Sequence, residues 1–332
     1  MGPDMNSTLF PQFSLSTDRQ KSSAPVSGTE SMIVIGGGPA GYTAALYGAR
    51  AALSPLVLLG PAPGGQAATA DLMENVPGFP EGITGQALAA RMREQAESFG
   101  ARMQSEDVTA VDLSRRPFRV VTLDGEYLAK TLVIATGAHS RRLGVPGEDR
   151  FVGRGVSFCA NCDGLFFKEK TIAVVGGGDS ACDEAVFLAK FARQVWVIHR
   201  RDQFRANQRA RDRVLSHPKI KVIWNAVVDE IFGEKRVQRA RLHRLDTGEV
   251  SDLAVDGVFV YIGMDPNTQL FEGQLALDSR GYIVTDRQQA TSVPGVFAAG
   301  DVQDPDFRQV ATAAGSGAAA AIQAEHFLAH EE

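Results

Sequence analysis

Two cysteines separated by two residues, Cys159 and Cys162, are followed at once by Asp163. A dithiol with this spacing can close a small disulfide ring, and through thiolate attack it can take up or release two electrons. The carboxylate of Asp163 is placed to move the accompanying proton. We therefore predict a redox element here, provided that another group nearby supplies the electrons.

Three other interpretations of the cysteine pair compete with this one. A zinc site would need a second pair of ligands, but the chain has only one further cysteine, Cys182, and six scattered histidines, so we predict no metal. With three cysteines and no secretory signal, the chain is expected to be cytoplasmic. Structural disulfides are rare in the cytoplasm. Two buried thiols without a role would be the default for an isolated motif. Glycine-rich fingerprints on either side favour the redox interpretation, and Cys182 is expected to be a small buried residue without a redox role.

The composition is that of a globular protein of two domains. The 332 residues are 44% hydrophobic and carry 34 basic and 39 acidic side chains, a net charge of −5. We expect neither nucleic acid nor a membrane as a partner, because the chain has no basic excess and no apolar run long enough to span a bilayer. Residues 1–30, rich in Ser, Thr, Pro and Gln, are expected to form a mobile tail and lack the features of a secretory signal.

The first glycine-rich fingerprint follows a short β-branched run at residues 31–35, which predicts a buried parallel strand. Gly36 allows a tight turn, Gly38 lets the backbone approach a pyrophosphate, and Gly41 lets the next helix, 42–51, pack close to the sheet. The N-terminus of that helix would face the phosphates. A second strand, 55–59, ends in Gly60 where an NAD site would have an acid, which weakens a simple NAD interpretation.

Further elements complete this first unit. A Gly64-Gly65 pair predicts a loop whose backbone comes close to a ligand. We predict a helix at 85–99, a strand region at 101–112, a hairpin at 119–127 and a separate buried strand at 132–137 that ends in Thr136-Gly137 against a cofactor. The strand at 293–301 ends in Gly300-Asp301, and a helix starts near residues 308–310; its N-terminus could stabilise negative charge on a reduced flavin.

The same pattern then restarts at a second fingerprint. A strand at 171–175 precedes Gly176 and Gly178, with alanine at the third glycine position, and a helix to about residue 192 and a strand at 194–198 follow. Residues 219–263 look like strands and turns that complete this unit. The repeat predicts two nucleotide sites and an α/β fold with two Rossmann-like dinucleotide-binding domains.

The residues after the second unit's next strand indicate which nucleotide binds. An NAD site would have an acid here, but the chain has His199, Arg200 and Arg201, with Arg205 one turn further. The planar fork of arginine matches phosphate oxygens, which favours the 2′-phosphate of NADP. The alternative interpretation of this cluster is a basic helix surface exposed to solvent. We assign the later arginines to solvent or to a protein partner: Arg209, Arg211 and Arg213.

With two fingerprints, a cysteine pair between them and a C-terminal Gly-Asp strand, the chain resembles the low-molecular-weight (bacterial-type) thioredoxin reductases, which are class II pyridine nucleotide-disulfide oxidoreductases. The likeness covers nearly all of residues 31–330. The matching segments are 36–50, 64–66, 135–138, 159–164, 176–184, 199–205, 299–301 and 308–309. Asn161 departs from the Thr or Val more common between the two cysteines, which leaves the ring size unchanged.

The resemblance implies FAD at the first fingerprint and NADPH at the second. It implies an FAD-binding domain of residues 31–138 and 266–332, with an inserted NADPH-binding domain, 139–265, that carries the cysteines. The FAD residues would be Gly36, Gly38, Pro39, Ala40, Gly41, Leu59, Gly60, Gly64, Gly65, Gln66, Asn75, Val108, Thr136, Gly137, Gly300, Asp301, Arg308, Gln309 and Val310. The NADPH residues would be Gly176, Gly178, Asp179, Ser180, His199, Arg200, Arg201, Arg205, Ile262 and Gly263.

The resemblance also implies a reaction. NADPH would reduce FAD, FAD would reduce the Cys159–Cys162 disulfide, and the dithiol would reduce the disulfide of thioredoxin, with Asp163 as general acid or base. The nicotinamide and the cysteines would reach the flavin in turn by rotation of one domain, with chain crossings near residues 138–140 and 263–266. A homodimer is implied by the family alone.

Two other functions remain open from the residues. One is a flavin reductase that passes electrons to a ferredoxin, a flavodoxin or a quinone, and such relatives generally lack the cysteine pair. The other is a flavin-holding sensor without turnover, against which the intact cysteines, Asp163 and both nucleotide loops argue.

Overall fold

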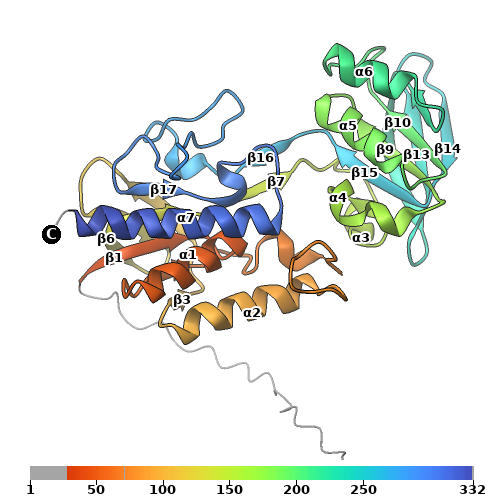
Figure 1. Ribbon diagram of the computed structural model, residues 1–332. Coiled ribbons are helices and arrows are strands. Elements are labelled where there is room, and N and C mark those ends of the chain that lie inside the picture. The colour runs from red at the N-terminus through yellow and green to blue at the C-terminus, as the bar shows by residue number, and fades with distance from the viewer. Residues whose placement is uncertain (1–27, 71, 331–332) are drawn as a thin grey trace, which may run out of the picture.

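The computed structural model describes residues 28–70 and 72–330. Most of the predicted mobile tail therefore lies outside the described residues, but order begins slightly before the predicted residue 31, because Thr29 already pairs with Leu128. The described chain forms two bodies side by side, connected by two strands (Figure 1).

The first body is built on one seven-stranded sheet. Its strand order is β3-β2-β1-β6-β5-β4, and β17 also pairs with β6. The strands are β1 (Thr29–Ile35), β2 (Leu56–Leu58), β3 (Arg102–Gln104), β4 (Val108–Asp112), β5 (Phe118–Thr122), β6 (Glu126–Ile134) and β17 (Val296–Ala298). Successive residues Met32, Ile33 and Val34 of β1 are fully buried. Burial on both faces explains the continuous apolar run that predicted a parallel strand.

Strand β6 corrects one prediction. The hairpin strand ending at residue 127 and the buried strand beginning at 132 are one strand, Glu126–Ile134, whose burial alternates at first and is then continuous. The strand pairs antiparallel with β5 and parallel with β1. Residues 128–131 contain no Gly or Pro that could end a strand, so the change of pattern marks a change of surroundings and not a break in the chain.

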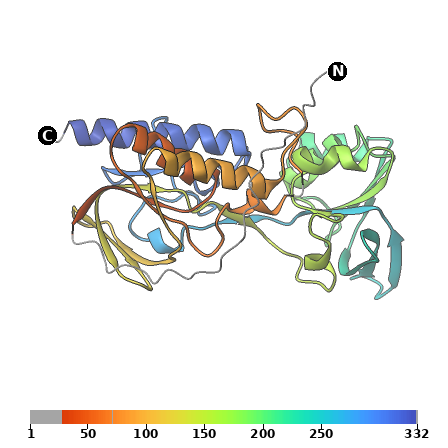
Figure 2. The ribbon, with the colours of Figure 1, turned by 90° about the horizontal axis from the view of Figure 1, so that it is seen from below.

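Three helices cover one face of this sheet (Figure 2). They are α1 (Pro39–Arg50), α2 (Gly85–Ser98) and α7 (Val310–Ala329). Helices α1 and α7 approach so closely that a Cβ added to Gly317 of α7 would lie 2.2 Å from the carbonyl oxygen of Ala40 in α1. The absence of a side chain at Gly317 therefore allows this close contact.

The second body has a parallel five-stranded sheet with the order β11-β10-β9-β15-β8. Its strands are β8 (Val156–Ser157), β9 (Thr171–Gly176), β10 (Gln194–Ile198), β11 (Ile220–Ile223) and β15 (Gly257–Tyr261). A separate antiparallel sheet contains β12 (Ala226–Gly233), β13 (Val237–Arg244) and β14 (Val250–Ala254), and the helices are α3 (Glu148–Phe151), α4 (Ala160–Asp163), α5 (Asp179–Leu188) and α6 (Gln208–Leu215). The predicted α/β fold with two Rossmann-like units is confirmed. Helix α5 ends at Leu188, four residues before the predicted end.

The two bodies are linked by β7 (Ala138–Ser140) and β16 (Met264–Pro266), which pair antiparallel. These strands lie at the predicted chain crossings. Next to the pair, Arg141 Nη2 donates to Asp265 Oδ1 at 2.6 Å, and this ion pair joins the two crossing segments. The guanidinium lowers the pKa of the Asp265 carboxyl through its hydrogen bonds.

Two glycines of α7 should respond in opposite directions to substitution by alanine. Gly317→Ala places a methyl group against the Ala40 carbonyl and should destabilise the protein by about 1–3 kcal/mol. Gly315→Ala has no heavy atom within 4 Å of its new Cβ and lies on the exposed side of the helix, so it should stabilise the protein by about 0.5–1 kcal/mol. Urea unfolding of the two variants measures both values. Equal effects would contradict the described packing of α7.

Candidate active site

The cysteines Cys159 and Cys162 form a disulfide, with their Cα atoms 5.3 Å apart. Cys159 is the N-cap of the four-residue helix α4, and its Sγ accepts a hydrogen bond from Cys162 N at 3.2 Å. Ser157 Oγ accepts from Cys159 N at 3.1 Å. The chain around the disulfide is thus held by short-range hydrogen bonds that the motif itself supplies.

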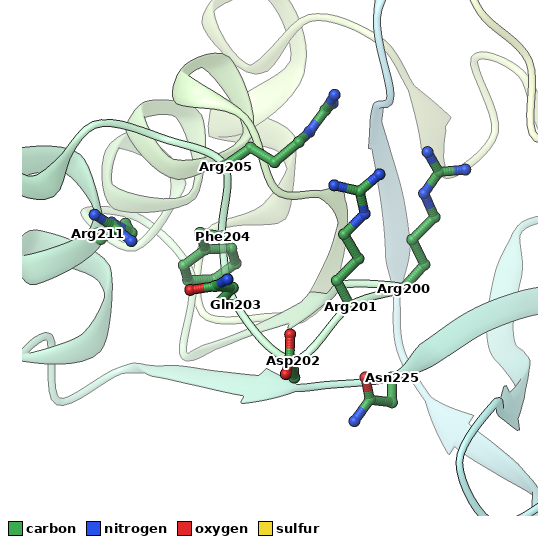
Figure 3. A pocket seen from close by; sticks show the side chains of 8 residues that line it. All are labelled: Arg200, Arg201, Asp202, Gln203, Phe204, Arg205, Arg211 and Asn225. Atoms are coloured by element: carbon green, nitrogen blue, oxygen red, sulfur yellow. The ribbon is translucent and has the colours of Figure 1, made fainter.

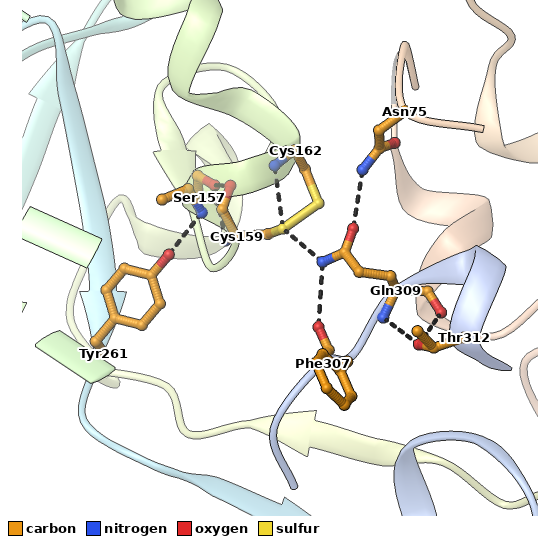
Figure 4. Close-up of a disulfide and its surroundings, with 9 residues drawn as sticks. Asn75, Ser157, Cys159, Cys162, Tyr261, Phe307, Gln309 and Thr312 are labelled. Carbon is orange, nitrogen blue, oxygen red and sulfur yellow. Dashed lines mark hydrogen bonds between the residues drawn. A yellow bond between two sulfur atoms is a disulfide. The ribbon is translucent and has the colours of Figure 1, made fainter. Parts of the chain in front are cut away.

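Two residues distant in sequence also contact the disulfide segment (Figure 4). The hydroxyl of Tyr261, at the end of β15, accepts a hydrogen bond from Ala160 N at 2.6 Å. From the first body, Gln309 Nε2 approaches Cys159 Sγ at 3.9 Å, and its Oε1 accepts from Asn75 Nδ2 at 2.9 Å. The disulfide of the second body therefore faces the first body.

A cavity of about 1070 Å³ lies between the disulfide and the first glycine loop. Cys159, Cys162 and Asp163 line it. Seventeen of the predicted FAD residues line it as well: Gly36, Gly38, Pro39, Ala40, Leu59, Gly60, Gly65, Gln66, Asn75, Val108, Thr136, Gly137, Gly300, Asp301, Arg308, Gln309 and Val310. The structure thus brings the disulfide to the same cavity as a glycine loop more than a hundred residues earlier in the chain.

The remaining two predicted FAD residues, Gly41 and Gly64, support the cavity from outside. A Cβ at Gly41 would lie 1.9 Å from the carbonyl oxygen of Gly36, and one at Gly64 would lie 2.6 Å from the Ala68 Cβ. Their role in the structure is to allow close packing, as the third glycine of the fingerprint was predicted to do.

The first glycine loop fits a bound dinucleotide. A Cβ at Gly38 would meet no atom within 4 Å, so the missing side chain leaves open space at the start of α1. The N-terminus of α1 has no side-chain cap and no acidic residue in its first turn. Its free N–H groups and the helix dipole are suited to a pyrophosphate.

Two carboxyl groups also line this cavity. Burial raises the pKa of Asp301, just after β17, to about 6, and repulsion from Asp304 adds to the effect. Burial also raises the pKa of Glu184 on α5. A carboxyl group at the position of Asp301 is an acceptor suited to the hydroxyl groups of a sugar-like ligand.

The second glycine loop resembles the first. Gly176 ends β9 with φ +153°, and a Cβ there would lie 2.3 Å from the carbonyl oxygen of Tyr261. Gly178 is the N-cap of α5 and borders open space. Asp179 Oδ1 accepts from the backbone N of Asn207 at 2.9 Å, so this carboxylate fixes the loop before α6. Ser180 follows in the first turn of α5, and Ile262 and Gly263 follow β15.

Arg200, Arg201 and Arg205 line an open depression of about 630 Å³ beside this loop. Their side chains are exposed and extend toward the same side (Figure 3). Because none of the three has a carboxylate partner among the ion pairs of the described residues, their guanidinium groups are available to an anion. This geometry fits the predicted phosphate contact.

His199 lies beneath the arginines and not among them. The residue is 5% exposed, and its ring packs against Phe204 and Trp224, with ring centroids 5.6 and 6.2 Å away. Burial lowers its pKa, which favours the neutral form of the ring. A Cβ on Gly177 would lie 2.2 Å from this ring, which indicates that His199 supports the glycine loop.

Comparisons with known proteins agree with this geometry. A family model described as pyridine nucleotide-disulphide oxidoreductase matches residues 30–317. The thioredoxin reductase of Mycolicibacterium smegmatis is 51% identical over 302 residues, which are 91% of this chain and 97% of that protein. The chain belongs to the thioredoxin reductase family. It is therefore an oxidoreductase, and membership implies a flavin and a pyridine nucleotide.

Solved structures of the family resemble this one to different degrees. The thioredoxin reductase from Streptococcus pyogenes superposes with a TM-score of 0.87 at 44% identity, covering 91% of this chain and 99% of that chain. The Lactococcus lactis thioredoxin reductase, described as the FR conformation, gives a TM-score of 0.63 at 41% identity, covering 91% of this chain and 100% of that chain. The two relatives are thus almost equally identical to this chain and cover it equally, but their structures superpose on it to very different degrees.

Sequence reasoning did not single out Tyr261, which contacts the redox segment, or Asn225, which lines the arginine depression. Arg211, assigned above to solvent or a protein partner, lines the depression as well. Tyr261 gave a weak signal, since it is the one residue with a hydroxyl group in the apolar run 257–263, next to the predicted Ile262 and Gly263. Asn225 gave none, because it reaches the depression from the end of a different strand, β11.

Cys182 is a free thiol with no exposed surface, and burial raises its pKa to about 11. Among residues 28–70 and 72–330, no group of three or more His, Cys, Asp or Glu side chains is arranged to hold a metal ion. In the same part of the chain, no helix combines the length and the apolar character needed to cross a bilayer.

Proposed function

We propose that this protein is an NADPH-dependent thioredoxin reductase, a thioredoxin-disulfide reductase that uses FAD. The observation that carries the proposal is that the Cys159–Cys162 disulfide and the first glycine loop line one cavity. Bound FAD would supply a two-electron carrier between the nicotinamide and the disulfide. It would be held by the cavity residues of the first body, with the N-terminus of α1 at the pyrophosphate and Asp301 as a hydroxyl acceptor.

We propose the domain division that the separate sheets support. Residues 31–138 and 266–332 would form the FAD-binding domain, and residues 139–265 the NADPH-binding domain. NADPH would lie along Gly176, Gly178 and Ser180, with its 2′-phosphate at Arg200, Arg201 and Arg205. Asp179 and His199 would then act by fixing the loops around the nucleotide.

The protein's own residues would undergo one reaction, the reduction and reoxidation of the Cys159–Cys162 disulfide. Reducing the disulfide requires two electrons and two protons, and gives two thiols. We propose Asp163 as the group that delivers and removes a proton, because it follows Cys162 directly and lines the same cavity. The dithiol would then reduce the disulfide of thioredoxin by exchange through a mixed disulfide.

A protein substrate would find an apolar surface next to the cysteines. Leu165 and Phe166, in the segment after α4, are 58% and 41% exposed. Exposed apolar side chains beside a reactive group support docking of another protein. A homodimer and a cytoplasmic location are further parts of the proposal that rest on the family resemblance and on cysteine usage.

We also propose that one domain rotates against the other about β7 and β16. The disulfide faces the cavity in this structure, so it has to leave that position to meet thioredoxin. The lower TM-score against the Lactococcus lactis structure, at similar identity and coverage, supports a different domain arrangement in a relative. Two strands and the exposed Arg141–Asp265 ion pair form a link small enough to act as a hinge.

Replacing one redox cysteine tests the reaction. Cys159→Ser should lower NADPH-dependent reduction of thioredoxin by at least about 1000-fold, because no disulfide can form. Oxidation of NADPH by an artificial electron acceptor should persist, since that reaction does not need the disulfide. Cys182→Ser is the matched control and should reduce thioredoxin like the unmodified protein. Thioredoxin reduction by Cys159→Ser would refute the proposal and favour a flavin reductase with another acceptor.

The arginine depression should determine the choice of nucleotide. Arg201→Ala is expected to raise KM for NADPH roughly 10-fold or more, because it removes a charge-assisted contact to the 2′-phosphate, and to leave KM for NADH almost unchanged. Arg213→Ala is the control, since Arg213 pairs with Asp183 at 2.9 Å. Steady-state kinetics with both nucleotides distinguishes the two variants. Parallel changes of KM for NADPH and NADH would argue against phosphate recognition.

Domain rotation should change the distance between the two bodies during turnover. Fluorophores attached through unnatural amino acids at Glu94 on α2 and Arg209 on α6 should show a change in energy transfer when the disulfide is reduced. A pair at Glu94 and His326, both in the first body, should show a constant signal. Full turnover with a constant Glu94–Arg209 signal would refute the rotation.

A further inference from the structure

Strand β15 supports the redox segment, residues 157–167, with one of its faces. Alternate residues of a strand point to the same side, so Gly257, Phe259 and Tyr261 share a face. Phe259 packs edge to face against Phe167, which ends the segment after the cysteines, with ring centroids 5.1 Å apart. A Cβ on Gly257 would lie 2.3 Å from the same Phe167 ring. The end of the redox segment is therefore fixed by apolar packing.

The beginning of the redox segment is fixed by a polar contact from the same face. Tyr261 Oη accepts the hydrogen bond from Ala160 N at 2.6 Å (Figure 4). Ala160 is the first residue of α4 and is 1% exposed, so its N–H has no access to water. The N–H groups of a first helical turn have no partner within the helix. Without the tyrosine hydroxyl, this N–H would be buried and unsatisfied, which is unfavourable.

The other backbone N–H groups near the cysteines have acceptors close in sequence, whereas Ala160 N donates to Tyr261. Cys162 N donates to Cys159 Sγ at 3.2 Å, Asp163 N donates to Cys159 O at 3.1 Å, and Cys159 N donates to Ser157 Oγ at 3.1 Å. Each of these donors thus already has a partner inside the segment. Besides the pairing of β8 with β15, Tyr261 attaches this segment to the sheet by its hydrogen bond with Ala160.

Tyr261 also borders the second glycine loop. It pairs with Gly176 in the ladder between β15 and β9, and its carbonyl oxygen is the atom that excludes a side chain at Gly176. Burial raises the pKa of the phenol far above its ordinary value. The group therefore remains a neutral hydroxyl throughout the working pH range, and its acceptor lone pair stays available to Ala160 N.

We infer that Tyr261 is a positioning residue for the redox centre, and that its hydroxyl stabilises the closed disulfide ring relative to the open dithiol. The closed ring holds Ala160 in the position where its N–H meets the hydroxyl. In the dithiol, the bond between the two sulfur atoms no longer fixes Ala160, so we expect the hydroxyl to matter less there. The inference rests on the proposed function only in taking the cysteine pair to be redox-active.

The test is the equilibrium of the protein's disulfide with glutathione. In this exchange the Cys159–Cys162 bond breaks and both sulfurs become thiols, while two glutathione molecules lose their thiol protons and form glutathione disulfide. Tyr261→Phe removes the hydroxyl and keeps the ring that packs in the cavity wall. We expect its equilibrium to shift at least tenfold toward the dithiol, which corresponds to about 30 mV. Alkylation of the free thiols followed by mass spectrometry gives the ratio of the two forms.

The matched control is Tyr127→Phe in the first body. Tyr127 is 7% exposed and donates to Glu106 Oε1 at 2.9 Å, so this variant also loses a buried, hydrogen-bonded hydroxyl, but far from the cysteines. It should lower the stability of the protein without moving the glutathione equilibrium. If Tyr261→Phe shifts the equilibrium no more than Tyr127→Phe does, or shifts it toward the disulfide, the inference is wrong.

This experiment is independent of the proposed function. It uses neither NADPH nor thioredoxin, so it can be carried out even if the purified protein fails to reduce thioredoxin. Failure of that activity would refute the proposed function, while an unchanged equilibrium in Tyr261→Phe would refute the role of the hydroxyl alone.

Discussion

Three close approaches of the backbone hold the first body together around its cavity. A side chain at Gly36 would lie 2.2 Å from the Ala135 carbonyl, one at Gly41 would lie 1.9 Å from the Gly36 carbonyl, and one at Gly317 would lie 2.2 Å from the Ala40 carbonyl. These contacts connect β6, β1, α1 and α7 in sequence. They place the start of α7, and with it Gln309, where it can reach Cys159 of the other body. The absence of three side chains thus determines where the redox centre meets the cofactor cavity.

Most of the fold could be predicted because its signals are local. A β-branched run, glycines at fixed spacing and a helix follow one another in each unit, and each depends on short-range sterics and burial. The error in β6 has the same origin: alternating and continuous apolar patterns look like two elements when a strand passes from the edge of a core to its centre. The early end of α5 shows that helix boundaries depend on contacts that the sequence does not display.

The site could be predicted most fully where one segment carries the chemistry, and less fully where partners come from elsewhere in the chain. The cysteines, the glycine loops and the arginines at 200, 201 and 205 are recognisable from spacing alone. The support that His199 gives to Gly177, and the contact between Tyr261 and Ala160, depend on the tertiary fold. Neither contact could be derived without knowing which strands are neighbours, since β15 comes a hundred residues after α4 yet lies beside β8 and β9.

Cys182 has a consequence for how the redox state can be observed. Its thiol is enclosed by the core of the second body and is held in the protonated form at neutral pH. With three cysteines in the chain, the pair at 159 and 162 has no competing thiol at the surface with which to scramble. A reagent that modifies accessible sulfhydryls in the native protein would thus count electrons directly: none for the oxidised chain and two for the reduced one.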